Sequence, residues 1–205
     1  MKKFGSLLGH NLIDIKKIIK ESSGYLDGYH LDMIDNHFAP NLGLGTDTIN
    51  SILNFTDKIC YIHLMLDNST NIISMLKVKN NTIIALHQES FDNKSKLLET
   101  ANIIKNKNAK VAIAVKVNTD FDSYKDIIKY FDNILILTVN PGFSGSDFIS
   151  DGYTQIKKIN NYLITNKLNT KIDLDGGINK DVLEKLKDVK INSITSSNFQ
   201  FLKNI

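Results

Sequence analysis

Residues 29–65, YHLDMIDNHFAPNLGLGTDTINSILNFTDKICYIHLM, contain two short apolar runs with an amphipathic segment between them. Tyr29–Met33 and Cys60–Met65 have the length of buried strands. Thr46–Phe55 has the apolar spacing of a helix that packs on one face. A helix between two strands is the usual connection of parallel strands, because a tight hairpin can join only antiparallel ones. This stretch therefore predicts a parallel α/β architecture.

The same alternation of strand and helix continues along the whole chain. The other expected strands span residues 4–8, 82–86, 110–115, 134–139, 171–174 and 193–195. The other expected helices span residues 12–21, 71–76, 94–105, 123–130, 151–165 and 180–186. Eight such units without a break in composition predict one (β/α)8 TIM barrel domain over residues 1–205, since an open doubly wound sheet rarely needs eight evenly spaced units. Only residues 198–205 follow the last strand, so we expect a truncated final helix.

Composition excludes several classes of protein. The chain has 205 residues, a formal charge of +3 and a single cysteine, Cys60. One cysteine excludes a disulfide scaffold and a zinc cluster built on thiolates. No apolar run approaches the roughly 20 residues that span a bilayer, and Phe4–Leu8 is too short for the core of a signal peptide. We therefore expect no membrane partner and a cytoplasmic location.

All 25 basic residues are lysines, because the chain contains no arginine. A protein without arginine has no guanidinium fork for a phosphate or a carboxylate. Any bound anion must then be held by backbone amides, a helix N-terminus, lysine or a metal ion. The lysines are spread along the chain rather than clustered, so nucleic-acid binding is not expected.

Polar side chains gather where the predicted strands end. His30 and Asp32 lie on one side of their strand, and His63 and Asp175 end two others. The reactive groups of such barrels lie at the C-terminal ends of the strands. Two imidazoles and two carboxylates there predict a mixed nitrogen and oxygen site for one divalent transition ion. His87 and Glu89 end a fourth strand, and we expect them behind the ligands or at the rim (residues 87–89).

Three short loops offer free backbone amides at the same end of the barrel. Gly142, Ser144 and Gly145 follow Pro141, Asp175–Gly177 reads DGG, and Thr195–Ser197 reads TSS. Successive amides of this kind can form an anion-binding concavity. The loops after the seventh and eighth strands are a frequent phosphate site of these barrels. The sequence therefore predicts a phosphate held by amides.

Four motifs resemble the ribulose-phosphate 3-epimerase family, and they lie in the family's order from Phe4 to about Phe199. They are HLDMIDNHFAPNLGLG at 30–45, HLMLDN at 63–68, LTVNPGFSG at 137–145 and DLDGGIN at 173–179. The resemblance implies a phosphate-binding barrel of the ribulose-phosphate type that depends on a metal ion. It also implies interconversion of D-ribulose 5-phosphate and D-xylulose 5-phosphate, a reaction of the pentose phosphate pathway.

Carried over residue by residue, the resemblance implies a role for each matching position. The implied metal ligands are His30, Asp32, His63 and Asp175, of which Asp32 and Asp175 are also the two catalytic proton-transfer groups. The implied substrate- and phosphate-binding residues are Ser6, His63, Gly142, Phe143, Ser144, Gly145, Gly176, Gly177, Ser196 and Ser197. The implied apolar cap over the site is Ile34, Met65 and Leu137; the family usually has three methionines at these positions, and here only Met65 matches.

The chemistry of inverting C3 agrees with two carboxylates. One base would return the proton to the face it left, whereas two groups on opposite faces of a planar enediolate can exchange roles as base and acid. A divalent ion, with zinc expected and iron, manganese or cobalt as possible substitutes, would stabilise the developing oxyanion. We further expect a small sugar phosphate as the binding partner and a homo-oligomer.

The sequence leaves two alternative functions open. D-allulose-6-phosphate 3-epimerase would use the same chemistry on a six-carbon substrate. A non-catalytic sugar-phosphate-binding relative would explain the short C-terminus and two departures from the family in the loops, Ser146 in place of a glutamine and Ser196 in place of a glycine. Such a relative would, however, have no reason to keep all four predicted ligands. A related barrel decarboxylase is excluded, because Ile34 and His37 stand where its pattern requires lysine and aspartate.

Overall fold

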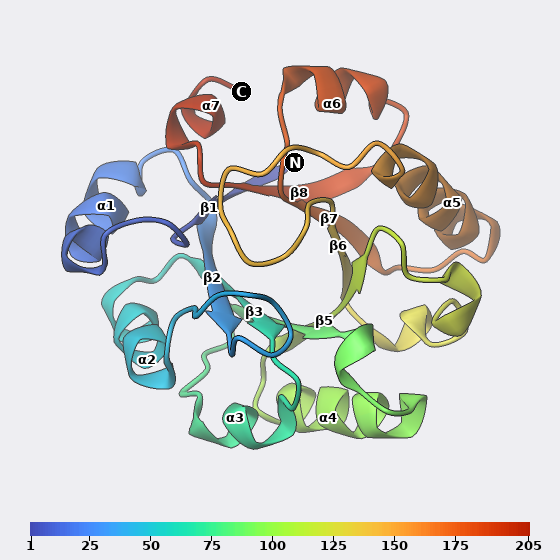
Figure 1. Ribbon diagram of the computed structural model, residues 1–205, viewed down its shortest axis with the longest axis horizontal. Coiled ribbons are helices and arrows are strands. Elements are labelled where there is room, and N and C mark those ends of the chain that lie inside the picture. Colours follow the sequence, from blue (N-terminus) through green and yellow to red (C-terminus); the bar gives the residue numbers. More distant parts are fainter.

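Eight parallel strands close into a barrel in the computed structural model, which describes residues 1–205 (Figure 1). Each strand pairs with its neighbours in sequence, and β8 pairs with β1. The strands are β1 (Lys2–Ser6), β2 (Gly28–Ile34), β3 (Ile59–Met65), β4 (Thr82–His87), β5 (Lys110–Lys116), β6 (Asn133–Leu137), β7 (Lys171–Asp175) and β8 (Ile191–Ser196). The predicted TIM barrel is therefore confirmed.

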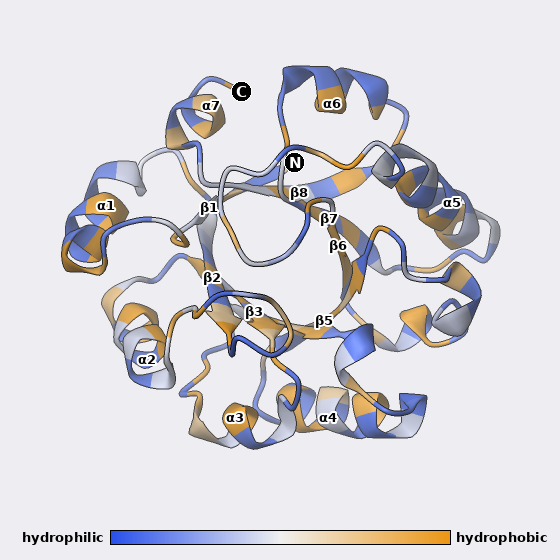
Figure 2. Cartoon of the chain, viewed as in Figure 1, coloured by the Kyte–Doolittle hydropathy of each residue, from blue (hydrophilic) through white to orange (hydrophobic).

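Helices surround the barrel as an outer ring (Figure 1). They are α1 (Ile15–Ser22), α2 (Thr46–Phe55), α3 (Thr70–Met75), α4 (Lys94–Asn106), α5 (Gly152–Thr165), α6 (Lys180–Lys185) and α7 (Phe199–Lys203). In Figure 2 apolar and polar residues alternate along these helices, as expected when one side of each helix packs on the barrel. The last helix, α7, has only five residues, so the predicted truncation is confirmed. No helix has the length and apolar character needed to cross a membrane.

The sequence-based prediction is wrong between β5 and β6. A helix was expected over residues 123–130, but the chain forms two short 3₁₀ helices, Phe121–Ser123 and Ile128–Tyr130. The side chain of Asp120 caps the first by accepting a hydrogen bond from the amide of Asp122. The buried side chains at 121, 124, 127 and 128 would also fit one face of an α-helix, so their spacing does not by itself indicate the two 3₁₀ helices.

The first strand also begins earlier than predicted, at Lys2 rather than Phe4, and ends at Ser6 rather than Leu8. Its pairing explains the shift, because Lys2 is already opposite Ser193 of β8. Leu8 instead lies partly buried against the loops at the C-terminal end of the barrel. The end of β1 therefore places Ser6, and not Leu8, at the level where the other strands carry polar residues.

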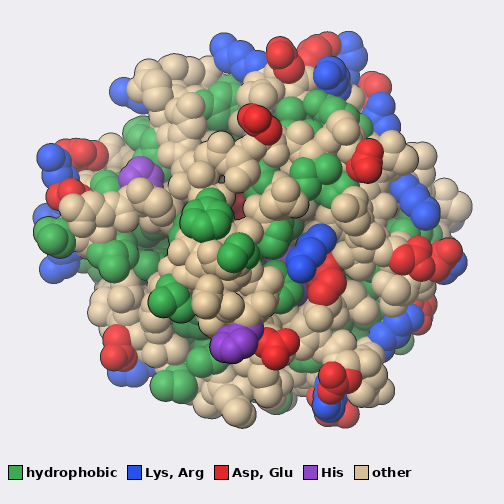
Figure 3. All heavy atoms as spheres, in the orientation of Figure 1, with side chains coloured by type: hydrophobic (Ala, Val, Ile, Leu, Met, Phe, Trp, Pro, Cys, Tyr) green, Lys and Arg blue, Asp and Glu red, His purple; other side chains and the backbone are tan.

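The loops after β2 and β6 cross in front of the barrel opening in Figure 1. Figure 3 shows this face in the same orientation, with most of the charged side chains at the periphery. The ends of the strands that carry the predicted site residues lie beneath these loops.

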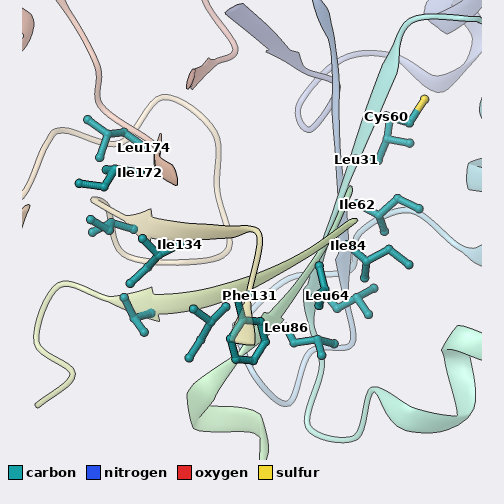
Figure 4. Close-up of a cluster of buried hydrophobic side chains, with 14 of the residues drawn as sticks. Leu31, Cys60, Ile62, Leu64, Ile84, Leu86, Phe131, Ile134, Ile172 and Leu174 are labelled. Atoms are coloured by element: carbon teal, nitrogen blue, oxygen red, sulfur yellow. The ribbon is translucent and has the colours of Figure 1, made fainter. Parts of the chain in front are cut away.

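The main core fills the space between the strands and the helices (Figure 4). Its strand residues include Leu31, Ile62, Leu64, Ile84 and Leu86, all fully buried. Successive side chains of a strand point to opposite sides, so the residues between these positions point into the barrel. The outward side chains of each strand thus pack against the helices, and the inward side chains are available for the site.

Inside the barrel, an apolar layer supports the site from below. Phe4, Tyr61, Ala85, Ala112 and Leu135 belong to one buried cluster of the barrel interior. The ring of Tyr61 packs edge-on against Phe4 and stacks on His30, with ring centroids 5.5 Å and 5.4 Å apart respectively. This packing fixes the height of His30 in the barrel.

Candidate active site

Four predicted ligand side chains from three strands meet at the C-terminal end of the barrel. The register of β2 and β3 places Asp32 directly opposite His63. Asp175 ends β7, and its carboxylate lies 3.3 Å from Nε2 of His30 and 3.2 Å from Nδ1 of His63. Asp32 approaches the same two nitrogens at 3.1 and 3.4 Å. One nitrogen or oxygen from each residue therefore lies within 4.8 Å of all the others.

The chemistry of this donor set fits a divalent ion. All four residues are buried, and the ring nitrogens of His30 and His63 face each other at 3.2 Å between two carboxylates. Two neutral imidazoles and two carboxylates present four lone pairs to one point, which suits a borderline cation such as a first-row transition ion. The structure therefore supports the predicted metal site at the level of a divalent cation.

The electrostatics of the four residues show how strongly their charges interact. Burial alone would lower the pKa of His30, but the carboxylates of Asp175 and Asp32 outweigh it and raise that pKa to about 10. Burial would raise the pKa of Asp32 and of Asp175, but the charge on His30 holds both below their ordinary values. Without a cation, protons on the imidazoles balance the two buried negative charges.

Each imidazole is also held from its far side. Nδ1 of His30 lies 3.2 Å from the hydroxyl oxygen of Thr195 on β8. Nε2 of His63 lies 2.8 Å from Nε2 of His87 on β4, and Nδ1 of His87 lies 2.9 Å from Glu89. Such partners commonly orient the rings that bind metals. His87 and Glu89 thus lie behind the ligands, where the sequence placed them.

Ser6 lies beside one of the predicted catalytic carboxylates. Its hydroxyl donates to Oδ2 of Asp32 at 3.0 Å, and it accepts from the amide of Leu8 at 3.2 Å. Oδ1 of Asp32 is the atom that approaches the histidines. The two oxygens of Asp32 therefore have different neighbours, one polar and uncharged, the other cationic.

The predicted apolar cap residues gather in one cluster. Ile34, Met65 and Leu137 are all at most 4% exposed and pack with Ala39 and Val139. Ala39 belongs to the loop after β2 and Val139 to the loop after β6. The cluster thus joins the strand ends to the two loops that cross the barrel opening.

A pocket of about 300 Å³ opens beside the four ligands. It reaches the predicted substrate residues of the loops and the carboxylates of the two aspartates, and Figure 3 shows the recessed centre of this face. Of the predicted site residues, those that line it are Ser6, Asp32, Met65, Leu137, Gly142, Phe143, Ser144, Gly145, Asp175, Gly176, Gly177, Ser196 and Ser197. His30, His63 and Ile34 do not line it, because the rings and the isoleucine lie buried behind the aspartates and the cap.

No lysine is among the residues that line the pocket. The backbone amides of Gly142–Gly145 and of Gly177 donate to no acceptor of the chain. The residues that carry these free donors line the pocket from the loops after β6 and β7. An anion in this pocket would therefore meet amides and hydroxyls rather than cationic side chains.

Gly177 has a second role that the sequence did not indicate. Its φ of +66° is unfavourable for other residues, and a Cβ there would lie 2.3 Å from the backbone nitrogen of Phe148. Phe148 follows the segment Gly142–Gly145 in the same loop. The glycine therefore permits close contact between the loops after β6 and β7, besides offering its own amide.

Two further residues of the site were missed by sequence reasoning. Thr195 was considered only for its backbone, but its side chain contacts His30. Asn41 bonds through its side-chain amide to the carbonyl oxygen of Gly142, which ties the loop after β2 to the loop after β6. Alternation along β8 could have placed Thr195 in the barrel, whereas no sequence pattern marks a contact between loops 101 residues apart.

Comparison with known proteins agrees with the family resemblance of the four sequence motifs. The sequence profile of the ribulose-phosphate 3 epimerase family matches residues 4–201. The chain is 31% identical over 166 residues to ribulose-phosphate 3-epimerase of Mycobacterium tuberculosis, covering 81% of this chain and 71% of that protein. It is 32% identical over 171 residues to the enzyme of the same name from Methanocaldococcus jannaschii, covering 83% and 70%. The Helicobacter pylori protein of that name is 25% identical over 201 residues, covering 98% and 91%.

Solved structures agree on the fold. A 3-keto-L-gulonate-6-phosphate decarboxylase from Vibrio cholerae superposes with a TM-score of 0.71 at 11% identity, covering 98% of this chain and 94% of that one. A phosphoribosyl anthranilate isomerase from Thermococcus kodakaraensis gives 0.61 at 14% identity, covering 95% and 87%. These two likenesses concern the barrel alone. The family match over residues 4–201, together with relatives above 30% identity, establishes that this chain belongs to the ribulose-phosphate 3-epimerase family.

Proposed function

We propose that this protein is a metal-dependent epimerase that interconverts D-ribulose 5-phosphate and D-xylulose 5-phosphate. The observation that carries the proposal is the pair of buried carboxylates, Asp32 and Asp175, which approach the same two histidines and also line the pocket. A site with one carboxylate would serve metal binding equally well. Two of them at one pocket suit a reaction that removes a proton from one face of a carbon and returns it to the other.

In the proposed mechanism, the two aspartates exchange roles with the direction of the reaction. One carboxylate takes the C3 proton, and the other, protonated, delivers a proton to the opposite face of the planar enediolate. Ser6 donates a hydrogen bond to Oδ2 of Asp32 and so restrains the carboxylate beside the substrate. The side chain of Asp175 is 12% exposed and that of Asp32 is 5% exposed, so neither loses its proton freely to bulk water.

His30, Asp32, His63 and Asp175 would hold the metal ion, which we propose to be zinc, with iron, manganese or cobalt able to replace it. When bound, the ion supplies Lewis acidity that stabilises negative charge developing on substrate oxygens. It would also replace the protons that otherwise balance the two carboxylates. Either aspartate could then act as the base near neutral pH while the other carries the proton that it delivers.

The cap residues Ile34, Met65 and Leu137 would exclude water from the enediolate. Met65 and Leu137 line the pocket directly, and Ile34 packs behind them. Exclusion of water strengthens the interactions of charged groups in the site and prevents loss of the transferred proton. We propose that Gly142–Gly145, Gly176–Gly177, Ser196 and Ser197 hold the phosphate through amides and hydroxyls, because no basic side chain lines the pocket.

The test is a coupled assay of metal-loaded and chelated protein on D-ribulose 5-phosphate and on D-allulose 6-phosphate. We expect turnover of the pentulose phosphate by the loaded protein, loss of activity with chelator and recovery when zinc is restored. Faster turnover of the hexulose phosphate would change the proposed substrate but leave the proposed mechanism in place. Binding of both sugar phosphates without turnover of either would identify a non-catalytic relative and contradict the proposal.

We also propose a cytoplasmic homo-oligomer. What supports self-association is the apolar groove between α1 and α2, beside which Leu12 is 59% and Ile13 is 89% exposed. Exposed apolar side chains that continue an apolar groove, rather than standing singly, often mark a contact surface. Light scattering of the purified protein should give a mass above 23.1 kDa, and the replacement Ile13→Ser should lower it. A monomeric mass for the unchanged protein would contradict this proposal.

A further inference from the structure

Three side chains form a continuous chain of hydrogen bonds from the metal ligands towards the surface. Nε2 of His63 lies 2.8 Å from Nε2 of His87, and Nδ1 of His87 lies 2.9 Å from Oε2 of Glu89. His87 is fully buried, whereas the side chain of Glu89 is 22% exposed. His87 also packs between the rings of His63 and Phe38, with centroids 4.9 and 4.5 Å away, so its ring orientation is fixed.

The outer end of this chain fixes the direction of every hydrogen bond in it. Oε1 of Glu89 accepts from the backbone amide of Lys116 at 2.9 Å and from the hydroxyl of Thr119. A backbone amide can only donate, so Oε1 must be an acceptor. Two donors on Oε1 favour the ionised carboxylate, and both oxygens of a carboxylate can only accept, so Oε2 accepts from His87. The direction of the pKa of Glu89 agrees, because its hydrogen bonds outweigh burial and lower it.

Because Oε2 accepts, Nδ1 of His87 carries a proton and Nε2 of His87 is left as an acceptor. That nitrogen faces Nε2 of His63, which therefore carries the proton of its own ring. When a metal ion takes the place of the second proton of the ring, Nδ1 of His63 is left unprotonated, and this is the atom that lies between Asp32 and Asp175. The position of one proton on His63 is thus set by a carboxylate two residues away in the chain of hydrogen bonds.

We propose that Glu89 is a positioning residue which, through His87, holds His63 in the one neutral tautomer that presents Nδ1 to the metal ion. The proposal rests on the metal-dependent function proposed above. It concerns where a proton resides rather than the net charge of any group. Glu89 does not line the pocket and would affect the reaction only through the affinity and placement of the ion.

The substitution Glu89→Gln should reverse the chain while keeping its shape. The side-chain amide must turn its oxygen towards the amide of Lys116, because two donors cannot face each other. Its NH₂ group then faces Nδ1 of His87 and forces the proton of His87 onto Nε2. His87 becomes a donor towards His63, whose proton is driven onto Nδ1, the ligand atom.

Thr119→Val is the matched control. It removes the other side-chain hydrogen bond to Glu89 but leaves the amide of Lys116 and the carboxylate in place. The direction of the chain should therefore be unchanged. Comparison of the two variants therefore separates the loss of a hydrogen bond to Glu89 from the reversal of the hydrogen-bond chain.

The experiment measures zinc affinity by competition with a chromogenic chelator and the tautomer of His87 by long-range ¹⁵N–¹H NMR of the zinc-loaded protein. We expect protonated Nδ1 and bare Nε2 on His87 of the unchanged protein. We expect Glu89→Gln to weaken zinc binding about 10- to 100-fold and Thr119→Val to leave it near the original value.

Equal zinc affinity of Glu89→Gln and the unchanged protein would overturn the proposal. So would a proton on Nε2 of His87 in the unchanged protein, a result that needs no variant to fold. If the unchanged protein binds no divalent ion, the proposed metal-dependent function is contradicted as well. If only the Glu89→Gln variant binds zinc as tightly as the unchanged protein, the inference about Glu89 fails and the proposed function stands.

Discussion

Asp173 and Asp175 point into the barrel from the same strand, two residues apart, and meet opposite surroundings. Asp173 accepts hydrogen bonds from four uncharged side chains at 2.6–3.0 Å. Asp175 instead faces Nε2 of His30 and Nδ1 of His63. Burial raises the pKa of Asp173, whereas the charge on His30 overcomes burial and lowers the pKa of Asp175. One carboxylate is thus satisfied by neutral donors, and the other faces the two histidines of the candidate metal site.

The first prediction concerns Asp173. Its oxygens accept from Tyr61, Asn133, Asn192 and Ser193. In Asp173→Asn, one oxygen becomes an NH₂ group facing two donors, so we expect the free energy of unfolding to fall by about 1–3 kcal/mol. Denaturant unfolding measures the loss, and zinc affinity is the control because Asp173 is not a ligand. A variant as stable as the unchanged protein would show that the four hydrogen bonds do not matter to the fold.

The second prediction concerns Gly177. Gly177→Ala places a methyl group against the backbone of Phe148 and strains a left-handed conformation, so the loop that carries Gly142–Gly145 must move. We expect KM for the sugar phosphate to rise about tenfold, which corresponds to about 1.4 kcal/mol of binding. Gly24→Ala is the matched control, because a Cβ at Gly24 meets no atom within 4 Å. Equal KM values for the two variants would contradict a phosphate site at this loop.

The third prediction concerns Met65 in the apolar cap. Met65→Gln keeps the length of the side chain but brings a hydrated amide into the pocket beside the aspartates. We expect kcat to fall about tenfold, about 1.4 kcal/mol in the barrier, while Met65→Leu stays close to the unchanged enzyme. Steady-state kinetics of both variants checks this. A polar variant with unaltered kcat would show that excluding water from the cap is unimportant.

The barrel and its ligand set were predictable from sequence because both depend on local alternation. Polar residues at every second position, such as His30 and Asp32, indicate which side of a strand faces the inside of the barrel. The four ligands then meet because parallel strands end at the same rim. Residues 123–130 were not predictable in the same way, since the spacing of their buried side chains fits an α-helix as well as the two 3₁₀ helices that form.

Contacts between distant elements lay beyond sequence reasoning. Thr195 reaches His30 only because β8 closes on β1, and Glu89 reaches the amide of Lys116 only through the pairing of β4 with β5. Gly177 was expected to offer an amide, but its need for close contact with Phe148 depends on how two loops pack. Closure and register of the whole barrel decide such contacts, and no local pattern encodes them.

The central claim is that Asp32 and Asp175 act on opposite faces of C3, and hydrogen exchange in two variants tests it most directly. Asp32→Asn and Asp175→Asn each keep an oxygen that can bind the ion but lose the ability to shuttle a proton. Each variant, with its metal content confirmed, is incubated in D₂O with each ketose phosphate separately. Deuterium at C3 is then measured by mass spectrometry.

Net epimerisation should be lost in both variants. The remaining carboxylate should still exchange the C3 proton of the one epimer that presents it. We therefore predict deuterium in only one of the two ketose phosphates for each variant, with opposite choices for Asp32→Asn and Asp175→Asn. Deuterium entering both epimers equally in either metal-replete variant would contradict the account, because it would require a single base or a relay through water.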